Sequence, residues 1–133
     1  MAMLHEEITQ KILEACFEVA GELGSGYLES VYQNALRIAF QQKDFQVMSQ
    51  QLISVAIRGH IVGEFYTDFL KNEKVIVEIK AVNTLLPEHD AQVINYLKAV
   101  GIEIGLLVNF GRPKLEYKRL YKSPKPSLNL SVS

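Results

Sequence analysis

Two carboxylates and a lysine fall within one short stretch of the sequence, residues 66–80. Asp68 precedes a turn, and Glu78 and Lys80 follow it in an apolar, β-branched segment, residues 75–81. Because side chains alternate between the two faces of a strand, Glu78 and Lys80 share a face. A charged pair in such an apolar strand costs desolvation energy unless it is paired, binds a metal or lines a cleft. With Asp68 across from Glu78, the set could bind a hard divalent cation beside a lysine.

The turn between the two strands decides whether Asp68 and Glu78 meet. Alternation along the first strand places Tyr66, Asp68 and Leu70 on one face and Phe65, Thr67 and Phe69 on the other. A two-residue turn at Asn72-Glu73 puts Asp68 opposite Val77, on the wrong face. A three-residue turn or a bulge puts Asp68 opposite Glu78. The alternative interpretation is a surface salt bridge on a half-buried hairpin.

Bulk composition limits the class of protein. A chain of 133 residues can form one domain with a substantial core. We expect that domain at residues 1–122, and a tail at residues 123–133 that forms an edge strand or a subunit contact, with a homodimer as one form of assembly. The formal net charge of −1 shows no basic surplus. The single cysteine, Cys16, excludes an internal disulfide and is expected to be buried. Without a signal-peptide pattern or a membrane-spanning run, we expect a cytoplasmic protein with no membrane partner.

Apolar spacing predicts helices and strands in a definite order. Expected helices occupy residues 4–23, 28–42 and 88–100, and expected strands occupy residues 45–58, 61–70, 75–81 and 104–110, with a last strand or short helix at 115–121. The helix between the strands at 75–81 and 104–110 permits a parallel, right-handed crossover. The predicted fold is therefore α/β, with a mixed sheet flanked by helices.

Four motifs follow one another along this predicted fold. They are Gly26-Tyr-Leu-Glu29-Ser-Val-Tyr32, then Asp68 with Glu78-Ile79-Lys80, then Gln92-Val-Ile-Asn-Tyr96, then Asn109-Phe110-Gly111. The second motif resembles the core of the PD-(D/E)XK nuclease superfamily, with Thr67 in place of the usual proline. The first matches the motif that names the GxxExxY family of that superfamily, and the last is similar to that family too. The third matches the Gln-x-x-x-Tyr motif of the RecB-like exonuclease branch.

The resemblance covers about residues 5–121 and implies a restriction-endonuclease-like fold that hydrolyses phosphodiester bonds with a metal ion. The nucleic-acid substrate would be DNA or RNA, with DNA favoured, and the cofactor would be Mg²⁺ or Mn²⁺. The implied metal ligands are Asp68, Glu78 and the carbonyl of Ile79, with Glu29 as a further acidic contact. Lys80 would orient the attacking water or offset negative charge, and Gln92 and Tyr96 would place the water or contact the phosphate.

Two further candidates and two rival functions complete the expectations. His89 shares a helix face with Gln92 and Tyr96, and Tyr32 lies one turn from Glu29. Each of these residues also has a purely structural explanation, because Glu29 suits a helix N-terminus and the tyrosines suit a core. The first rival to a nuclease is a non-catalytic member of the fold that binds a protein or a nucleic acid. The second rival is an enzyme acting on a small phosphorylated molecule.

Overall fold

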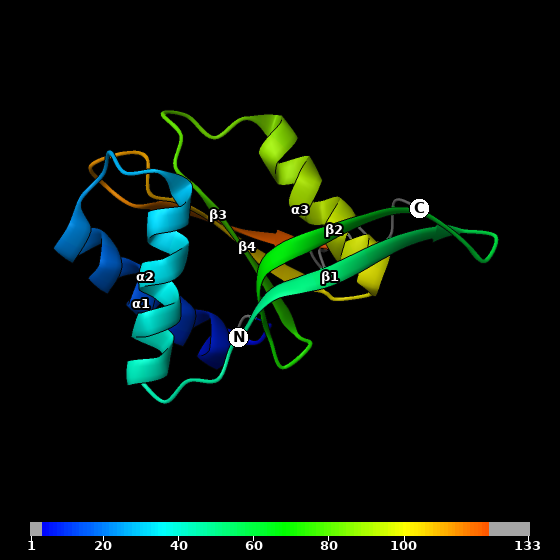
Figure 1. Cartoon of the computed structure of the whole chain (residues 1–133), viewed down its shortest axis with the longest axis horizontal. Coiled ribbons are helices and arrows are strands. Elements are labelled where there is room, and N and C mark those ends of the chain that lie inside the picture. Colours follow the sequence, from blue (N-terminus) through cyan, green and yellow to red (C-terminus); the bar gives the residue numbers. More distant parts are fainter. Residues whose placement is uncertain (1–3, 123–133) are drawn as a thin grey trace, which may run out of the picture.

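One mixed five-stranded sheet carries helices on both faces (Figure 1). The structure is a computed structural model that describes residues 4–122. In chain order the elements are α1 (Glu6–Leu23), α2 (Glu29–Gln42), β1 (Met48–Ile57), β2 (His60–Lys71), β3 (Val75–Lys80), α3 (Pro87–Val100), β4 (Ile104–Asn109) and β5 (Glu116–Tyr121). Among these helices none is both long and apolar enough to cross a membrane. The tail expected at residues 123–133 lies outside the described residues.

The sheet has the mixed topology that the sequence predicts. Its strand order is β1-β2-β3-β4-β5, and every neighbouring pair is antiparallel except β3 and β4. Those two run parallel from Val75 opposite Ile104 to Lys80 opposite Asn109. Because α3 connects them, it forms the expected crossover. The segment at 115–121 forms a strand, β5, antiparallel to β4.

Two apolar clusters fill the space between the helices and the sheet. Helices α1 and α2 bury one face, where Val77, Ile79 and Leu106 pack, and α3 buries the other, where Ile76 and Leu107 pack. Strands β3 and β4 are thus covered on both sides, which is why their sequences are nearly continuous apolar runs. The first cluster also contains the buried Cys16, as expected, and burial raises the pKa of its thiol.

The turn between β2 and β3 has the length that brings Asp68 toward Glu78. Lys71 pairs with Val75, so three residues form the turn. Asn72 and Glu73 both have φ of 55°, and the amide of Lys74 donates to the carbonyl of Lys71 at 2.9 Å. The three-residue alternative is therefore the one the chain adopts.

Strict alternation along β2 is wrong. Phe65 packs in the cluster under α3, whereas Phe69, four residues on, packs in the cluster under α1 and α2. Thr67, Asp68 and Phe69 are buried in succession, so the strand changes face at this point. The neighbouring strand is irregular at the same level: Gln51 pairs with Thr67 and Ser49 with Phe69, and Gln50 between them has φ of 53°.

Candidate active site

Asp68 and Glu78 are joined through hydrogen bonds at the end of β2–β3 pairing. The amide of Asp68 donates to Glu78 Oε2 at 2.8 Å, and the amide of Ile79 donates to Asp68 Oδ2 at 2.7 Å. Thr67 Oγ1 donates to the same Glu78 oxygen at 2.8 Å. Thr67 thus faces Glu78, contrary to the alternation expected from sequence, because the strand changes face here. Both residues are buried, with 9% of Asp68 and 5% of Glu78 exposed.

Burial and mutual repulsion make these two carboxyl groups hard to ionise. Desolvation is the main cause that raises the pKa of Asp68 to about 6, and the Ile79 amide opposes it. Desolvation is also the first cause for Glu78, followed by the charge of Asp68, and together they raise its pKa to about 7. Lys80 lowers the pKa of both groups without cancelling the rise. Two carboxyl groups whose pKa values lie near neutrality favour binding of a cation, since the cation would relieve the repulsion between their charges.

Helix α2 adds a carboxylate and an amide at its first turns. Gln33 Nε2 donates to Asp68 Oδ1 at 2.7 Å and to Glu29 Oε1 at 3.1 Å. Glu29 is therefore linked to Asp68 through one shared amide group. Desolvation raises the pKa of Glu29, and the charge of Lys80 lowers it. The sequence reasoning overlooked Gln33. Its only signal was the four-residue spacing from Glu29, which places both side chains on one helix face.

On the other side of the sheet, α3 brings an amide and a phenol. Lys80 Nζ donates to Gln92 Oε1 at 3.0 Å. Tyr96 lies one turn further along the helix, 8% exposed, with its ring stacked on Phe65 at a centroid distance of 4.1 Å. Burial, and then the charges of Glu78 and Asp68, raise the pKa of its hydroxyl. The structure therefore places Gln92 against Lys80, and Tyr96 close enough to Glu78 and Asp68 for their charges to act on its hydroxyl.

The end of β4 fixes the backbone that follows Lys80. The buried Asn109 side chain accepts from the amide of Val82 and donates to its carbonyl, both at 2.9 Å. It also accepts from the amide of Gly111 at 3.0 Å, and the amide of Phe110 donates to the carbonyl of Lys80 at 2.8 Å. A Cβ on Gly111 would overlap the backbone of Val82. The Asn109-Phe110-Gly111 motif thus acts as a clamp: it fixes the backbone at Val82, two residues after Lys80.

Tyr32 is a structural part of this region. It is fully buried and stacks on Phe110 at a centroid distance of 4.7 Å. Its hydroxyl donates to the carbonyl of Gly24 at 2.7 Å and accepts from the amide of Tyr27 at 3.2 Å. Tyr32 therefore holds the loop that leads into Glu29, and its ring lies within the core.

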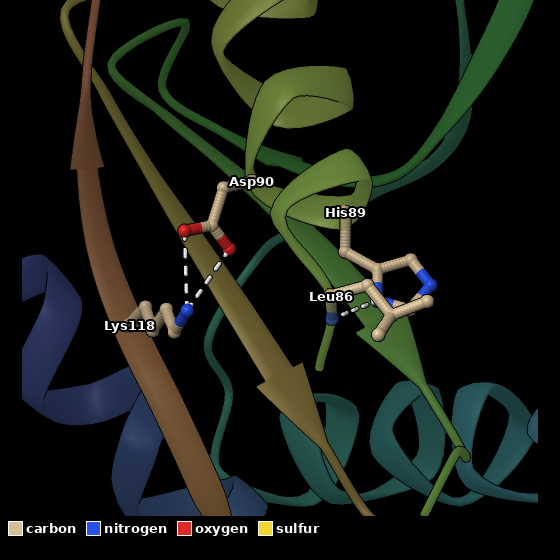
Figure 2. A network of polar contacts seen from close by, with 4 residues as sticks. All are labelled: Leu86, His89, Asp90 and Lys118. Carbon is tan, nitrogen blue, oxygen red and sulfur yellow. Dashed lines mark hydrogen bonds and ion pairs between the residues drawn. The ribbon is translucent and has the colours of Figure 1, made fainter. Parts of the chain in front are cut away.

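His89 and Asp90 anchor the start of α3 (Figure 2). His89 Nδ1 accepts from the amide of Leu86 at 2.9 Å, which satisfies a free N–H at the helix N-terminus. Asp90 points the other way and pairs with Lys118 of β5 at 3.1 Å. Within residues 4–122, neither side chain has a hydrogen bond or an ion pair with Asp68 or Glu78.

The donor set fits a hard cation that keeps part of its water shell. Across the described part of the chain, no three His, Cys, Asp or Glu side chains gather closely enough to enclose a metal. Asp68 and Glu78 supply two carboxylates, and no described residue donates to Glu78 Oε1. Mg²⁺ is commonly held by one or two carboxylates with waters in the other positions. The residues present therefore suit an ion of that kind and do not form a complete protein cage.

Comparison with known proteins agrees with this fold. The sequence model described as the PD-(D/E)XK nuclease superfamily matches residues 6–120. A solved structure described as "Crystal structure of SSO0001" has a similar fold, with a TM-score of 0.56 over 69% of this chain and 17% sequence identity. The match covers 48% of that chain, so the present chain spans about half of its length. No curated protein matches.

Proposed function

The chain belongs to the PD-(D/E)XK nuclease superfamily, and from that premise we propose that it is a metal-dependent nuclease that cleaves phosphodiester bonds at Asp68 and Glu78. Nucleases of this superfamily act on nucleic acids and generally use divalent metal ions. The observation that carries the proposal is the pair itself: two buried carboxyl groups of raised pKa, with Lys80 and Gln92 joined beside them.

The proposed ligands of Mg²⁺ or Mn²⁺ are Asp68, Glu78 and the carbonyl of Ile79. A bound ion of this kind lowers the pKa of a coordinated water and polarises the phosphoryl oxygen. Glu29 is connected to the proposed ligand Asp68 through Gln33. The Gln33 amide donates to both carboxylates and so orients that of Asp68. This arrangement supports Glu29 as an outer acidic group and favours Gln33 as a positioning residue.

Lys80, Gln92 and Tyr96 handle the reacting groups in this proposal. Lys80 offsets the negative charge that develops on the phosphate. Gln92 holds the ammonium group through its Oε1 and hydrogen-bonds Tyr96, and the second N–H of its amide would contact the phosphate or the attacking water. Tyr96, with a pKa raised by burial, stays protonated and can donate a hydrogen bond from its hydroxyl.

The finer assignment is to the GxxExxY group of the superfamily, with DNA as the preferred substrate. Gly26, Glu29 and Tyr32 support it through their roles in the structure. Gly26 has φ of 111°, in the region that glycine tolerates best. Tyr32 then binds the loop on either side of Gly26, and Glu29 follows at the start of α2.

A non-catalytic binding module is the second candidate. Three of the four carboxylate oxygens of Asp68 and Glu78 already accept hydrogen bonds from protein groups. Buried carboxylates with a purely structural role would require the same hydrogen bonds. Metal binding separates the two candidates, since only the nuclease needs a cation at these oxygens.

The decisive experiment is cleavage by purified protein in Mg²⁺ and in Mn²⁺. Single-stranded, duplex and branched DNA are compared with matching RNA, beside Glu78→Gln and Asp68→Asn. We expect cleavage by the wild-type protein alone. Absence of cleavage on every substrate, or equal cleavage by Glu78→Gln, would overturn the nuclease proposal.

A further inference from the structure

A groove runs from the candidate active site along α3. It has a volume of about 720 Å³, within the range of small-molecule sites. The hairpin of β1 and β2 supplies one wall through Val55 and Phe65, and α3 supplies the other through Ala91, Asn95 and Tyr96. Figure 1 shows α3 lying alongside these two strands. Gln92, which binds Lys80 Nζ, also lines the groove, so the groove reaches the polar residues beside the carboxylate pair.

The walls of the groove suit a flat, uncharged group. Phe65 and Tyr96 form a stacked pair, with an angle of 22° between the ring planes, and the other apolar lining residues are Val55, Ala91 and Ala99. The charged side chains that line it are Glu88 and Lys98, one of each sign, so together they give phosphate no net attraction. Asn95 is exposed and lines the groove, where its amide can both donate and accept hydrogen bonds.

Gly63 places no side chain beside Val55 on the hairpin wall. It pairs with Val55 across the hairpin, two residues before Phe65, on the face that looks toward α3. A Cβ built on Gly63 would meet no atom within 4 Å. The space beside Val55 is therefore free of a neighbouring side chain, and an incoming group can lie there.

We propose that this groove holds the base of an unpaired nucleotide whose phosphate lies at Asp68 and Glu78. The inference deepens the proposed function and rests on it for the position of the phosphate. Apolar and aromatic walls accept the face of any base, and the Asn95 amide meets its polar edge. In an intact duplex the bases are paired and stacked, so they cannot enter. The substrate class is therefore single strands, flaps or frayed ends in preference to continuous duplex.

The test is binding of fluorescently labelled single-stranded and duplex DNA of one sequence, followed by anisotropy in EDTA so that no metal-dependent cleavage occurs. Ala91→Leu fills the groove from an exposed helix position, and Asn95→Ala removes its amide. Ala56→Leu is the matched control, because it adds the same side chain to an exposed alanine that does not line the groove.

We expect the wild-type protein to bind the single strand more tightly than the duplex. Ala91→Leu should weaken single-strand binding roughly 5- to 150-fold, the range of one base–aromatic stack, and Ala56→Leu should leave it unchanged. Equal effects of Ala91→Leu and Ala56→Leu, or equal binding of both DNA forms, would overturn the inference even if the protein cleaves DNA. Groove-dependent binding without cleavage in any metal would support the base site and refute the nuclease proposal.

Discussion

Asp68 and Glu78 each accept a hydrogen bond from the backbone of the other's strand. The amide of Asp68 binds the Glu78 carboxylate, and the amide of Ile79, next to Glu78, binds the Asp68 carboxylate. The regular β2–β3 ladder reaches only to Phe69 opposite Val77. Side-chain hydrogen bonds thus replace main-chain ones beyond that point, and the backbone of two strands fixes the position of both acids.

The Glu78→Gln substitution should abolish metal-dependent cleavage and preserve the fold. The Oε1 atom of the new glutamine can accept from Thr67 Oγ1 and the Asp68 amide, as Glu78 Oε2 does. Its amide nitrogen can take the place of Glu78 Oε1, an oxygen to which no described residue donates. Without metal, the variant should melt at a higher temperature than the wild type near pH 8, since it removes one of two repelling charges. Thermal melts in EDTA measure this, and a lower melting temperature would contradict it.

Stability without metal should fall as the pH rises from about 4 to about 7. The native carboxyls of Asp68 and Glu78 keep their protons up to about 6 and about 7, whereas the unfolded chain releases them near pH 4. Unfolding in that window therefore releases protons, and higher pH favours it. The wild type should lose on the order of a few kcal/mol relative to Glu78→Gln across the window. Urea titrations at several pH values measure the difference, and a difference that does not vary with pH would refute the assignment.

Much of the fold follows from spacing alone. Apolar periodicity gives the helices, and the helix before β4 gives the parallel pair, because a parallel neighbour needs a long crossover. Spacing left two alternatives for Asp68, opposite Val77 or opposite Glu78, and the three-residue turn of the structure decides for Glu78. The apolar spacing could not predict that β2 changes face at Thr67. This change depends on an irregularity in β1 at Gln50 and on side-chain hydrogen bonds that no periodicity encodes.

The site could be predicted in part for the same reason. Asp68, Glu78 and Lys80 stand out because charge in an apolar strand is costly. Gln33 does not stand out, since a glutamine on a helix surface is ordinary and its contact with Asp68 spans 35 residues of sequence. Tyr32 and Asn109 carry motif positions, but only the structure shows what they bind.

Lys80→Met should reduce the cleavage rate and preserve metal binding. The ammonium group binds Gln92 and lowers the pKa of Glu29, Asp68 and Glu78. Loss of a preorganised charge at a transition state typically costs roughly 10²- to 10³-fold in rate. The pH at which activity is half-maximal should also move upward, because the acids lose their nearest cation. Rates and Mn²⁺-induced melting shifts measure both effects, with the exposed Lys74→Met as control; loss of the Mn²⁺ shift would contradict this role.

Gln33→Leu should lower the rate by releasing the Asp68 carboxylate from α2. It removes the donor to Asp68 Oδ1 and the link to Glu29, so Asp68 keeps only the Ile79 amide. We expect weaker Mn²⁺ binding, on the order of 10- to 100-fold as for other groups that orient a metal ligand. Asn34→Leu, an exposed neighbour on the same helix, is the control. Equal Mn²⁺ affinity of the two variants would show that Gln33 has no part in orienting Asp68.

Asn109→Leu and Gly111→Ala should destabilise the protein and disturb the site together. Leucine leaves the amide and carbonyl of Val82 without their partner, at about 1–3 kcal/mol for each unsatisfied group. Alanine at 111 forces the chain away from Val82, because its Cβ would overlap that backbone. Gly21→Ala is the control, since Gly21 is exposed and a Cβ there meets nothing within 4 Å. Urea unfolding and Mn²⁺ titration measure the two effects. Asn109 and Gly111 hold Val82, two residues beyond Lys80. A variant that loses stability but keeps wild-type Mn²⁺ affinity and rate would therefore show that this motif supports only the fold.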